Sequence, residues 1–160
     1  MKLLVMRHGQ ALSVIEAGVK HDQDRPLSPA GREEAKRQAG RLLARSSVPA
    51  LILASPLLRA RQTGAELRRA LNDKPELRVY EPLANHTTGD ELYRAFVKDG
   101  PWPGLALLIG HMPQLGELAS GLLGTRVDLQ TAELVAVDAV GLGRSRLLWS
   151  AAPADPVGGG

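Results

Sequence analysis

The chain has 160 residues, of which 44% are hydrophobic and 3% aromatic, and its formal net charge at pH 7 is +3. This length and hydrophobic content fit one globular domain with a core of aliphatic side chains. The small positive charge gives no reason to expect nucleic acid or a membrane as a partner. The absence of cysteine excludes disulfides, thiolate metal sites and a cysteine nucleophile.

The first half of the chain alternates strands with helices. Residues 2–7 predict a buried strand, because four consecutive apolar residues precede the first arginine. This apolar run is too short for a signal peptide or a membrane span, so we expect a cytoplasmic protein. After a loop with two aspartates, Ser28 is a good N-cap for a helix within 27–46. A short strand over 49–55 and a helix over 56–72 follow.

The second half continues the alternation. Residues 77–80 predict a weak strand, and residues 88–100 a helix that opens with a capping box of Thr88 and Glu91. The remaining predicted elements are a buried strand over 105–110, a helix over 113–123, and two strands within 132–150 joined by a Gly-x-Gly turn.

This pattern predicts an α/β fold, with a single three-layer domain, a mostly parallel central sheet, an antiparallel edge strand and helices on both faces. We expect the domain to span residues 1–150. Residues 151–160 are small and turn-prone, which is typical of a flexible C-terminal tail.

Basic side chains follow three of the predicted strands. Arg7, His8 and Gly9 come directly after the first strand, Arg59 lies on the first turn after the second, and His111 follows the strand over 105–110. Ligands of open α/β sheets bind beyond the carboxyl ends of the strands. Two arginines and two histidines therefore converge, with no Asp or Glu immediately beside them in the sequence.

Such a cluster favours a bound phosphate, because arginine forks match its oxygens. Helix N-termini aimed at the same point would strengthen that preference. Nearby arginines lower the pKa of His8 and keep its imidazole neutral, which makes it a candidate nucleophile. Gly9 allows close backbone approach, and a backbone carbonyl can fix the tautomer of His8.

The other polar groups give weaker indications. His21 lies in a polar loop and is expected to be exposed, whereas Asn85 and His86 are candidates for the pocket wall. The four histidines lack a close metal-ligand spacing, which argues against zinc. One helix carries basic residues that we expect to form a solvated face: Arg32, Lys36, Arg37, Arg41 and Arg45.

Three motifs in order, "MRHG", "SPLLRARQT" and "LLIGHMPQL", resemble the histidine phosphatase superfamily, and their spacing resembles its small SixA-type branch of phosphohistidine phosphatases. The resemblance covers about residues 2–150. It implies that His8 accepts the phosphoryl group, that Arg7 and Arg59 bind it, and that His111 stabilises it. It also implies a metal-independent hydrolase without a cofactor.

The chain departs from many relatives that cleave phosphate esters, which carry a glutamate general acid after the third strand. Asn85 stands at about that position, with His86 beside it, while Asp90 and Glu91 are expected to serve the start of the next helix. An imidazole leaves more readily than an alkoxide and needs less acid catalysis. The pattern therefore favours phosphohistidine on a phosphorelay or phosphotransfer protein as substrate.

Two alternatives stay open at this point. One is a general phosphomonoesterase on small phosphorylated metabolites, with Asp90, Glu91 or His86 as the acid, and the other is a non-catalytic phosphate-binding module. A serine hydrolase and a P-loop NTPase are disfavoured, because neither Gly-x-Ser-x-Gly nor the P-loop motif occurs. The sequence does not predict an oligomeric state.

Overall fold

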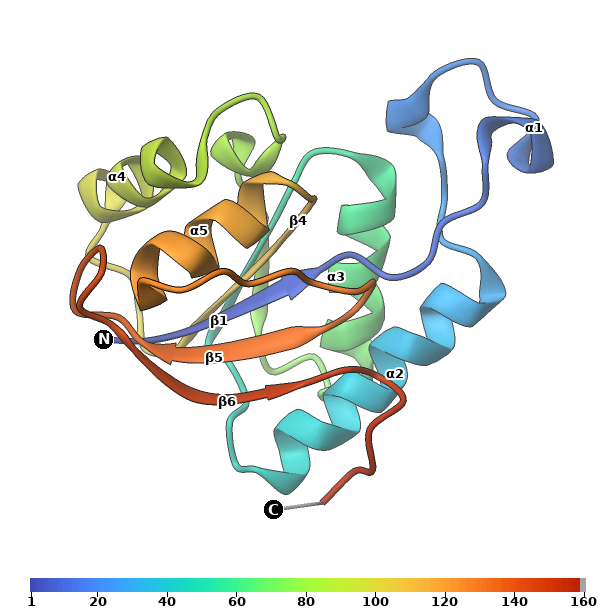
Figure 1. Ribbon diagram of the computed structural model, residues 1–160. Coiled ribbons are helices and arrows are strands. Elements are labelled where there is room, and N and C mark those ends of the chain that lie inside the picture. Colours follow the sequence, from blue (N-terminus) through green and yellow to red (C-terminus); the bar gives the residue numbers. More distant parts are fainter. Residues whose placement is uncertain (159–160) are drawn as a thin grey trace.

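Six strands form one sheet in the computed structural model, which describes residues 1–158. In chain order they are β1 (Lys2–Arg7), β2 (Leu51–Ala54), β3 (Glu76–Val79), β4 (Ala106–Gly110), β5 (Leu134–Asp138) and β6 (Arg146–Ala151). Their order across the sheet is β3-β2-β4-β1-β5-β6 (Figure 1). The first four run parallel, and β5 is antiparallel to both β1 and β6. The predicted mixed sheet with antiparallel pairing at one edge is confirmed.

Helices cover both faces of this sheet. The helices of residues 1–158 are α1 (Val14–Ala17), α2 (Pro29–Ala44), α3 (Leu58–Ala70), α4 (Gly89–Asp99) and α5 (Gln114–Leu123), with 3-10 turns η1 (Asp22–Asp24) and η2 (Glu81–Leu83). Of these, α1 lies on a segment that projects away from the sheet (Figure 1). The pair α2 and α3 packs on one face and the pair α4 and α5 on the other, as the three-layer prediction requires (Figure 1). Within residues 1–158, no helix has the length and apolar character needed to cross a membrane.

Local sequence explains where the longer helices begin. Ser28 caps α2 by accepting a hydrogen bond from the Gly31 N–H, and Thr88 and Glu91 form the predicted capping box of α4. The single-turn elements α1, η1 and η2 were not predicted, because one turn is too short to show a helical period.

The strand β1 is buried on both faces, which explains its continuous apolar run. Leu3 and Val5 face the core beneath α4 and α5, while Leu4 and Met6 face the core beneath α2 and α3. This burial fixes the register of β1 and therefore the point at which its polar end leaves the sheet.

Strand register brings three chain segments level at the carboxyl end of the sheet. Arg7 pairs with Gly110, and the His8 N–H donates to the Gly110 carbonyl at 3.0 Å. On the other side of β4, the Ser55 N–H donates to the Ile109 carbonyl at 2.9 Å. Residues that directly follow β1, β2 and β4 are therefore neighbours.

The basic face predicted on α2 is wrong for Arg41, which is only 2% exposed. Its Nε donates to Gln38 Oε1 at 2.8 Å, and its two terminal nitrogens donate to the backbone carbonyls of Ala152, Asp155 and Pro156. Burial of a charge requires such partners, and here they come from a distant part of the chain.

The same contacts define the path of the C-terminal segment. Ala151 still belongs to β6, and Arg37 on α2 donates to the carbonyls of Pro153 and Asp155. These hydrogen bonds fasten residues 152–156, which lie in the segment predicted as a flexible tail, to α2. The part of that prediction that concerns 159–160 lies outside the described residues.

Candidate active site

His8 lies just beyond β1 and is 8% exposed. Its Nδ1 is 2.6 Å from the carbonyl oxygen of Gly9, which can only accept, so the ring proton is on Nδ1 and a lone pair is on Nε2. Burial, together with the charges of Arg59, Arg7 and Arg25, lowers the pKa of His8 to about 4 against the opposing effect of the Gly9 hydrogen bond. At neutral pH the side chain is an uncharged imidazole whose lone pair is on Nε2.

Arg59, on the first turn of α3, lies against that nitrogen. Its Nε donates to His8 Nε2 at 3.3 Å, and its guanidinium is almost completely buried. The other two nitrogens bind Asp22: Nη1 donates to the backbone carbonyl at 2.9 Å, and Nη2 donates to Oδ2 at 3.1 Å. The arginine thus joins the histidine to a carboxylate.

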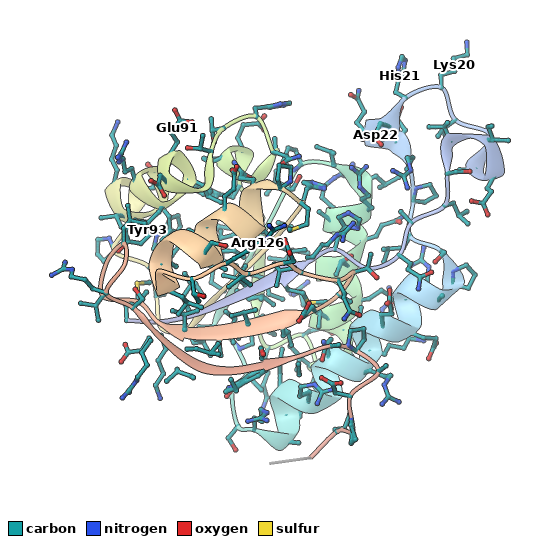
Figure 2. The ribbon with its side chains drawn as sticks, viewed as in Figure 1. Lys20, His21, Asp22, Glu91, Tyr93 and Arg126 are labelled. Carbon is teal, nitrogen blue, oxygen red and sulfur yellow. The ribbon has the colours of Figure 1, made fainter. Side chains whose placement is uncertain are left out.

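Asp22 corrects the expectation of a site without an adjacent carboxylate. It lies on η1 and bridges two cations, with Oδ2 accepting from Arg59 and Oδ1 from Arg25 at 3.0 Å. The hydrogen bond from Arg25 and the charge of Arg59 lower its pKa, so it is ionised at neutral pH. Figure 2 shows Asp22 on the projecting segment before α2, with Lys20 and His21 directed outward from the same segment.

Arg7 approaches the two histidines from the end of β1. Its Nη1 donates to the Leu129 carbonyl at 3.0 Å, while its Nε is buried and has no partner among the described residues. The charge of Arg7 lowers the pKa of both His8 and His111, which places the guanidinium within electrostatic reach of each ring.

His111 follows β4, and its ring centroid lies 5.1 Å from that of His8 at an interplanar angle of 52°. Burial, followed by the neighbouring His8 and Arg59, lowers the pKa of His111 to about 3. Its Nε2 is 2.7 Å from the hydroxyl of Ser55. The four residues predicted to converge, Arg7, His8, Arg59 and His111, therefore lie together at the carboxyl end of the sheet.

A cavity of about 300 Å³ opens beside this cluster. Its wall includes Arg59 and His111, together with Asp22 and the two predicted pocket residues Asn85 and His86. His8 is not part of the cavity wall. It lies behind Arg59, which lines the cavity and donates a hydrogen bond to His8 Nε2.

Asn85 holds the start of α5 rather than facing the cavity as a free amide. Its Oδ1 accepts from the Gln114 N–H at 3.1 Å, and its Nδ2 donates to the Met112 carbonyl at 3.1 Å. These bonds orient the segment that carries His111. An amide also cannot act as a general acid, so Asn85 has a structural task here.

Asp90 and Glu91 do not belong to the cavity wall. Glu91 completes the capping box by accepting from the Thr88 N–H at 2.9 Å, as its position in the sequence predicts. Both residues are exposed, and Figure 2 shows Glu91 on α4, far from the segment that carries Asp22. Among the described residues, Asp22 is the one carboxylate that lines the cavity.

Two residues outside the predicted set hold the loop after β1. The buried Thr63 accepts from the Gly9 N–H at 3.1 Å and donates to the Arg59 carbonyl at 2.7 Å, linking the two halves of the site. Glu34 accepts from the Gln10 N–H at 2.8 Å and from Thr131 Oγ1 at 3.1 Å. Thr63 lies four residues after Arg59, so the two share one face of α3. This spacing is the one feature of the sequence from which any of these contacts could have been predicted.

Glycine is required at position 9 because the backbone of Gly31 leaves no room for a side chain there. A Cβ at this position would lie 2.8 Å from the carbonyl oxygen of Gly31 at the start of α2. The loop after β1 can therefore pass α2 closely only with glycine at position 9.

The arrangement is suited to a tetrahedral oxyanion. Two guanidinium groups and a neutral histidine supply hydrogen-bond donors around the lone pair of His8, and arginine binds phosphoryl oxygens through paired N–H groups. Within residues 1–158, no group of three or more His, Cys, Asp or Glu side chains has the geometry to hold a metal ion.

A family profile and two known sequences match this chain. The profile of the histidine phosphatase superfamily (branch 1) matches residues 3–90. An uncharacterised protein of Picosynechococcus sp. is 35% identical over 140 residues, covering 84% of this chain and 83% of that protein. Phosphohistidine phosphatase SixA of Escherichia coli is 33% identical over 125 residues, covering 76% of this chain and 74% of that protein.

Solved structures show the same fold. A candidate phosphohistidine phosphatase SixA from Agrobacterium tumefaciens has a TM-score of 0.81 at 26% identity, covering 95% of this chain and 97% of that chain. A protein histidine phosphatase SixA complexed with tungstate has a TM-score of 0.78 at 28% identity, covering 96% and 97%, respectively.

Proposed function

Because this chain belongs to the histidine phosphatase superfamily, we propose that it is a phosphatase. In the proposed reaction His8 becomes phosphorylated, and the resulting phosphohistidine is then hydrolysed. The observation that carries this proposal is the fixed lone pair of His8 Nε2, set by the Nδ1 contact to Gly9 and flanked by Arg59. A neutral nitrogen held beside cationic donors is suited to in-line attack on phosphorus.

In the first step, His8 Nε2 attacks phosphorus and the bond from phosphorus to the leaving group breaks. The leaving group takes the electron pair of that bond and a proton from water. In the second step, water attacks the phosphorylated histidine, the P–N bond breaks and its electron pair returns to Nε2. Inorganic phosphate leaves, a proton goes to solvent, and the Nδ1 hydrogen bond to Gly9 persists throughout.

Arg7 and Arg59 bind the transferred group, and His111 donates to it. Negative charge is spread over the three equatorial oxygens in the transition state, so positioned donors stabilise it more than the ground state. A SixA relative of the same fold has been solved in complex with tungstate, a tetrahedral oxyanion, which supports a ligand of this class.

The preferred substrate is a phosphohistidine on a phosphorelay or phosphotransfer protein. Asn85 is held by α5, Glu91 caps α4, and Asp22 is ionised between two arginines, so none of them is a ready proton donor. Imidazole needs less protonation to leave than an alkoxide. The similarity to SixA of Escherichia coli points to the same substrate class.

The proposed reaction needs no metal or other cofactor, because arginine supplies the positive charge. Turnover is expected to persist in EDTA, and vanadate is expected to inhibit by matching the five-coordinate transition state. Activity that disappears with chelator and returns with a divalent cation would contradict this mechanism.

The deciding experiment incubates the protein with ³²P-phosphohistidine, phosphoramidate and alkyl phosphate, followed by rapid quenching. The wild type should carry acid-labile, base-stable label, and His8→Ala should carry none and show no turnover. His21→Ala is the matched control, because this exposed histidine lies outside the cluster and should retain full activity. Label that persists in His8→Ala would refute the assignment of the nucleophile.

The substrate panel also separates the two remaining functions. Alkyl phosphates hydrolysed as fast as phosphoramidates would identify a general phosphomonoesterase, with His86 as the cavity residue to test for acid catalysis. Binding of phosphoprotein with neither label nor turnover in the wild type would identify a phosphate-binding module.

A further inference from the structure

Two of the three buried side-chain nitrogen or oxygen atoms without a hydrogen-bond partner in residues 1–158 belong to the proposed phosphate site. They are Arg7 Nε and His111 Nδ1; the third is Gln114 Oε1. An unpaired buried polar atom is costly, and native proteins hold few of them. The arginine nitrogen is always a donor, whereas the histidine nitrogen is a donor only in one tautomer.

Ser55 is placed to decide that tautomer. It directly follows β2, is completely buried, and is fixed by the backbone hydrogen bond to Ile109. Its Oγ accepts from the Leu57 N–H at 3.2 Å and lies 2.7 Å from His111 Nε2. No other acceptor for the Ser55 hydroxyl proton exists among the described residues.

Two proton arrangements are compatible with the 2.7 Å contact. If Nε2 carries the proton, the Ser55 hydroxyl hydrogen is buried without an acceptor and Nδ1 presents a lone pair. If the hydroxyl donates to Nε2, its oxygen still accepts from the Leu57 N–H and the ring proton is on Nδ1. Each arrangement leaves one donor without a partner within the described residues: the buried Ser55 hydroxyl in the first and His111 Nδ1–H in the second. Only the second donor belongs to a residue of the cavity wall, where an anion or water can accept from it, so the second arrangement is favoured.

We propose that Ser55 is a positioning residue that holds the neutral His111 as its Nδ1–H tautomer, so that Nδ1 donates a hydrogen bond to the phosphoryl oxygens. This rests on the proposed function only for the identity of the anion. Water favours the opposite tautomer of neutral histidine, with the proton on Nε2. Ser55 thus reverses the intrinsic preference of the ring.

His111 then differs from His8 in its chemistry although the rings are adjacent. His8 is also protonated on Nδ1, but its proton is bound to Gly9 and its lone pair on Nε2 lies against Arg59 Nε. His111 has its lone pair bound to Ser55 and its proton free. One ring therefore attacks while the other donates, and neither needs to ionise.

The first test is ¹⁵N NMR of the histidine rings in the ligand-free protein, with His111→Gln identifying the His111 resonances. The wild type should show a protonated Nδ1 and an unprotonated Nε2 for His111. In Ser55→Ala the proton should move to Nε2. Ser120→Ala is the control: it removes a half-buried hydroxyl that binds the Val127 backbone, and it should leave the His111 resonances unchanged.

The second test is the affinity for inorganic tungstate. Loss of a donor to an anion should weaken binding roughly 10-fold in Ser55→Ala and have little effect in Ser120→Ala. The inference would be overturned if the wild-type His111 were protonated on Nε2, or if the tautomer were unchanged in Ser55→Ala. The first outcome needs only the wild-type spectrum, so the test decides even if the variant does not fold. The expected tautomers without phosphatase turnover would refute the proposed function alone.

Discussion

Arg41 and Arg59 are both almost completely buried, but they lie in regions with different partners. Arg41 donates to Gln38 and to backbone carbonyls of the C-terminal segment, all of which belong to the packed structure. Arg59 donates to His8 and to Asp22, whose side chain is 63% exposed on a projecting turn. Burial lowers the pKa of both arginines, yet only Arg59 has a partner that solvent or a ligand can replace.

The difference shows that a buried arginine has to be interpreted through its partners. Fixed carbonyl oxygens satisfy Arg41 permanently, so its charge contributes to the fold. The partner of Arg59 is an exposed carboxylate that an anion can displace, so the charge of Arg59 remains available to that anion. Substitutions in the two regions should therefore separate activity from stability.

The largest effect is expected at Arg59. Arg59→Gln should lower kcat/KM for phosphoramidate by about 10²- to 10³-fold, the usual effect of removing one transition-state donor. Arg59→Lys should recover little of this loss, because an ammonium group lacks the guanidinium fork. Thermal unfolding should change little in either variant. If Arg59→Gln kept a kcat/KM within tenfold of the wild type, the functional role assigned to Arg59 would be wrong.

Arg41→Met should have the opposite profile. Loss of its charged hydrogen bonds is expected to lower the free energy of unfolding by about 3 kcal/mol, with kcat/KM unchanged for the folded protein. Urea titration measures the first quantity. Arg37→Met is the milder control, since Arg37 binds the same segment from an exposed position, and its effect should stay below about 1 kcal/mol. A stable but inactive Arg41→Met would contradict the structural role.

Stability should also depend on pH in only one of the two regions. The pKa values of His8 and His111 are lowered to about 4 and about 3 from 6.5, so below pH 6.5 the unfolded chain binds protons that the folded chain does not. The free energy of unfolding therefore falls as pH falls through this window, by about 2 kcal/mol per histidine at pH 5.

Urea titrations between pH 5 and pH 7.5 check this dependence. His8→Asn and His111→Asn should each flatten the slope, whereas Arg41→Met should shift the curve without changing its slope, because arginine stays charged throughout. A wild-type curve that is flat over this range would show that the two histidines are not held neutral by the fold.

The smallest effect is expected at Asp22. Asp22→Asn removes the negative charge that competes for Arg59 and should tighten binding of vanadate roughly three- to tenfold, most clearly at low ionic strength. Asp24→Asn lies on the same turn without a bond to Arg59 and should change the affinity much less. Weaker vanadate binding in Asp22→Asn would mean that Asp22 orients Arg59 rather than competing for it.

The sequence predicts those parts of the fold that depend on neighbouring residues. The apolar runs identify the buried parallel strands, and Ser28, Thr88 and Glu91 mark helix starts because capping is local. The convergence of Arg7, His8, Arg59 and His111 is also predictable, since parallel strands deliver their carboxyl ends to one edge.

The remaining contacts join residues far apart in the chain. Asp22 reaches Arg59 only because η1 folds back over α3, and a loop of this kind has no periodicity to reveal its path. Ser55 and Thr63 are small polar residues whose partners depend on sheet register and helix packing. Arg41 follows the polar pattern of α2, and its burial depends on a segment more than 100 positions later.

The strand order has a consequence for how the protein is made. The strand that leads to the nucleophile, Lys2–Arg7, is synthesised first, yet its two neighbours in the sheet are Ala106–Gly110 and Leu134–Asp138. At about 5 to 20 residues per second, the roughly 100 intervening residues take a ribosome on the order of 5 to 20 s. Throughout that interval the apolar strand β1 has neither of its neighbours in the sheet, β4 and β5, to pair with. A nascent chain therefore cannot bring His8 and His111 together until residues 106–111 have been synthesised.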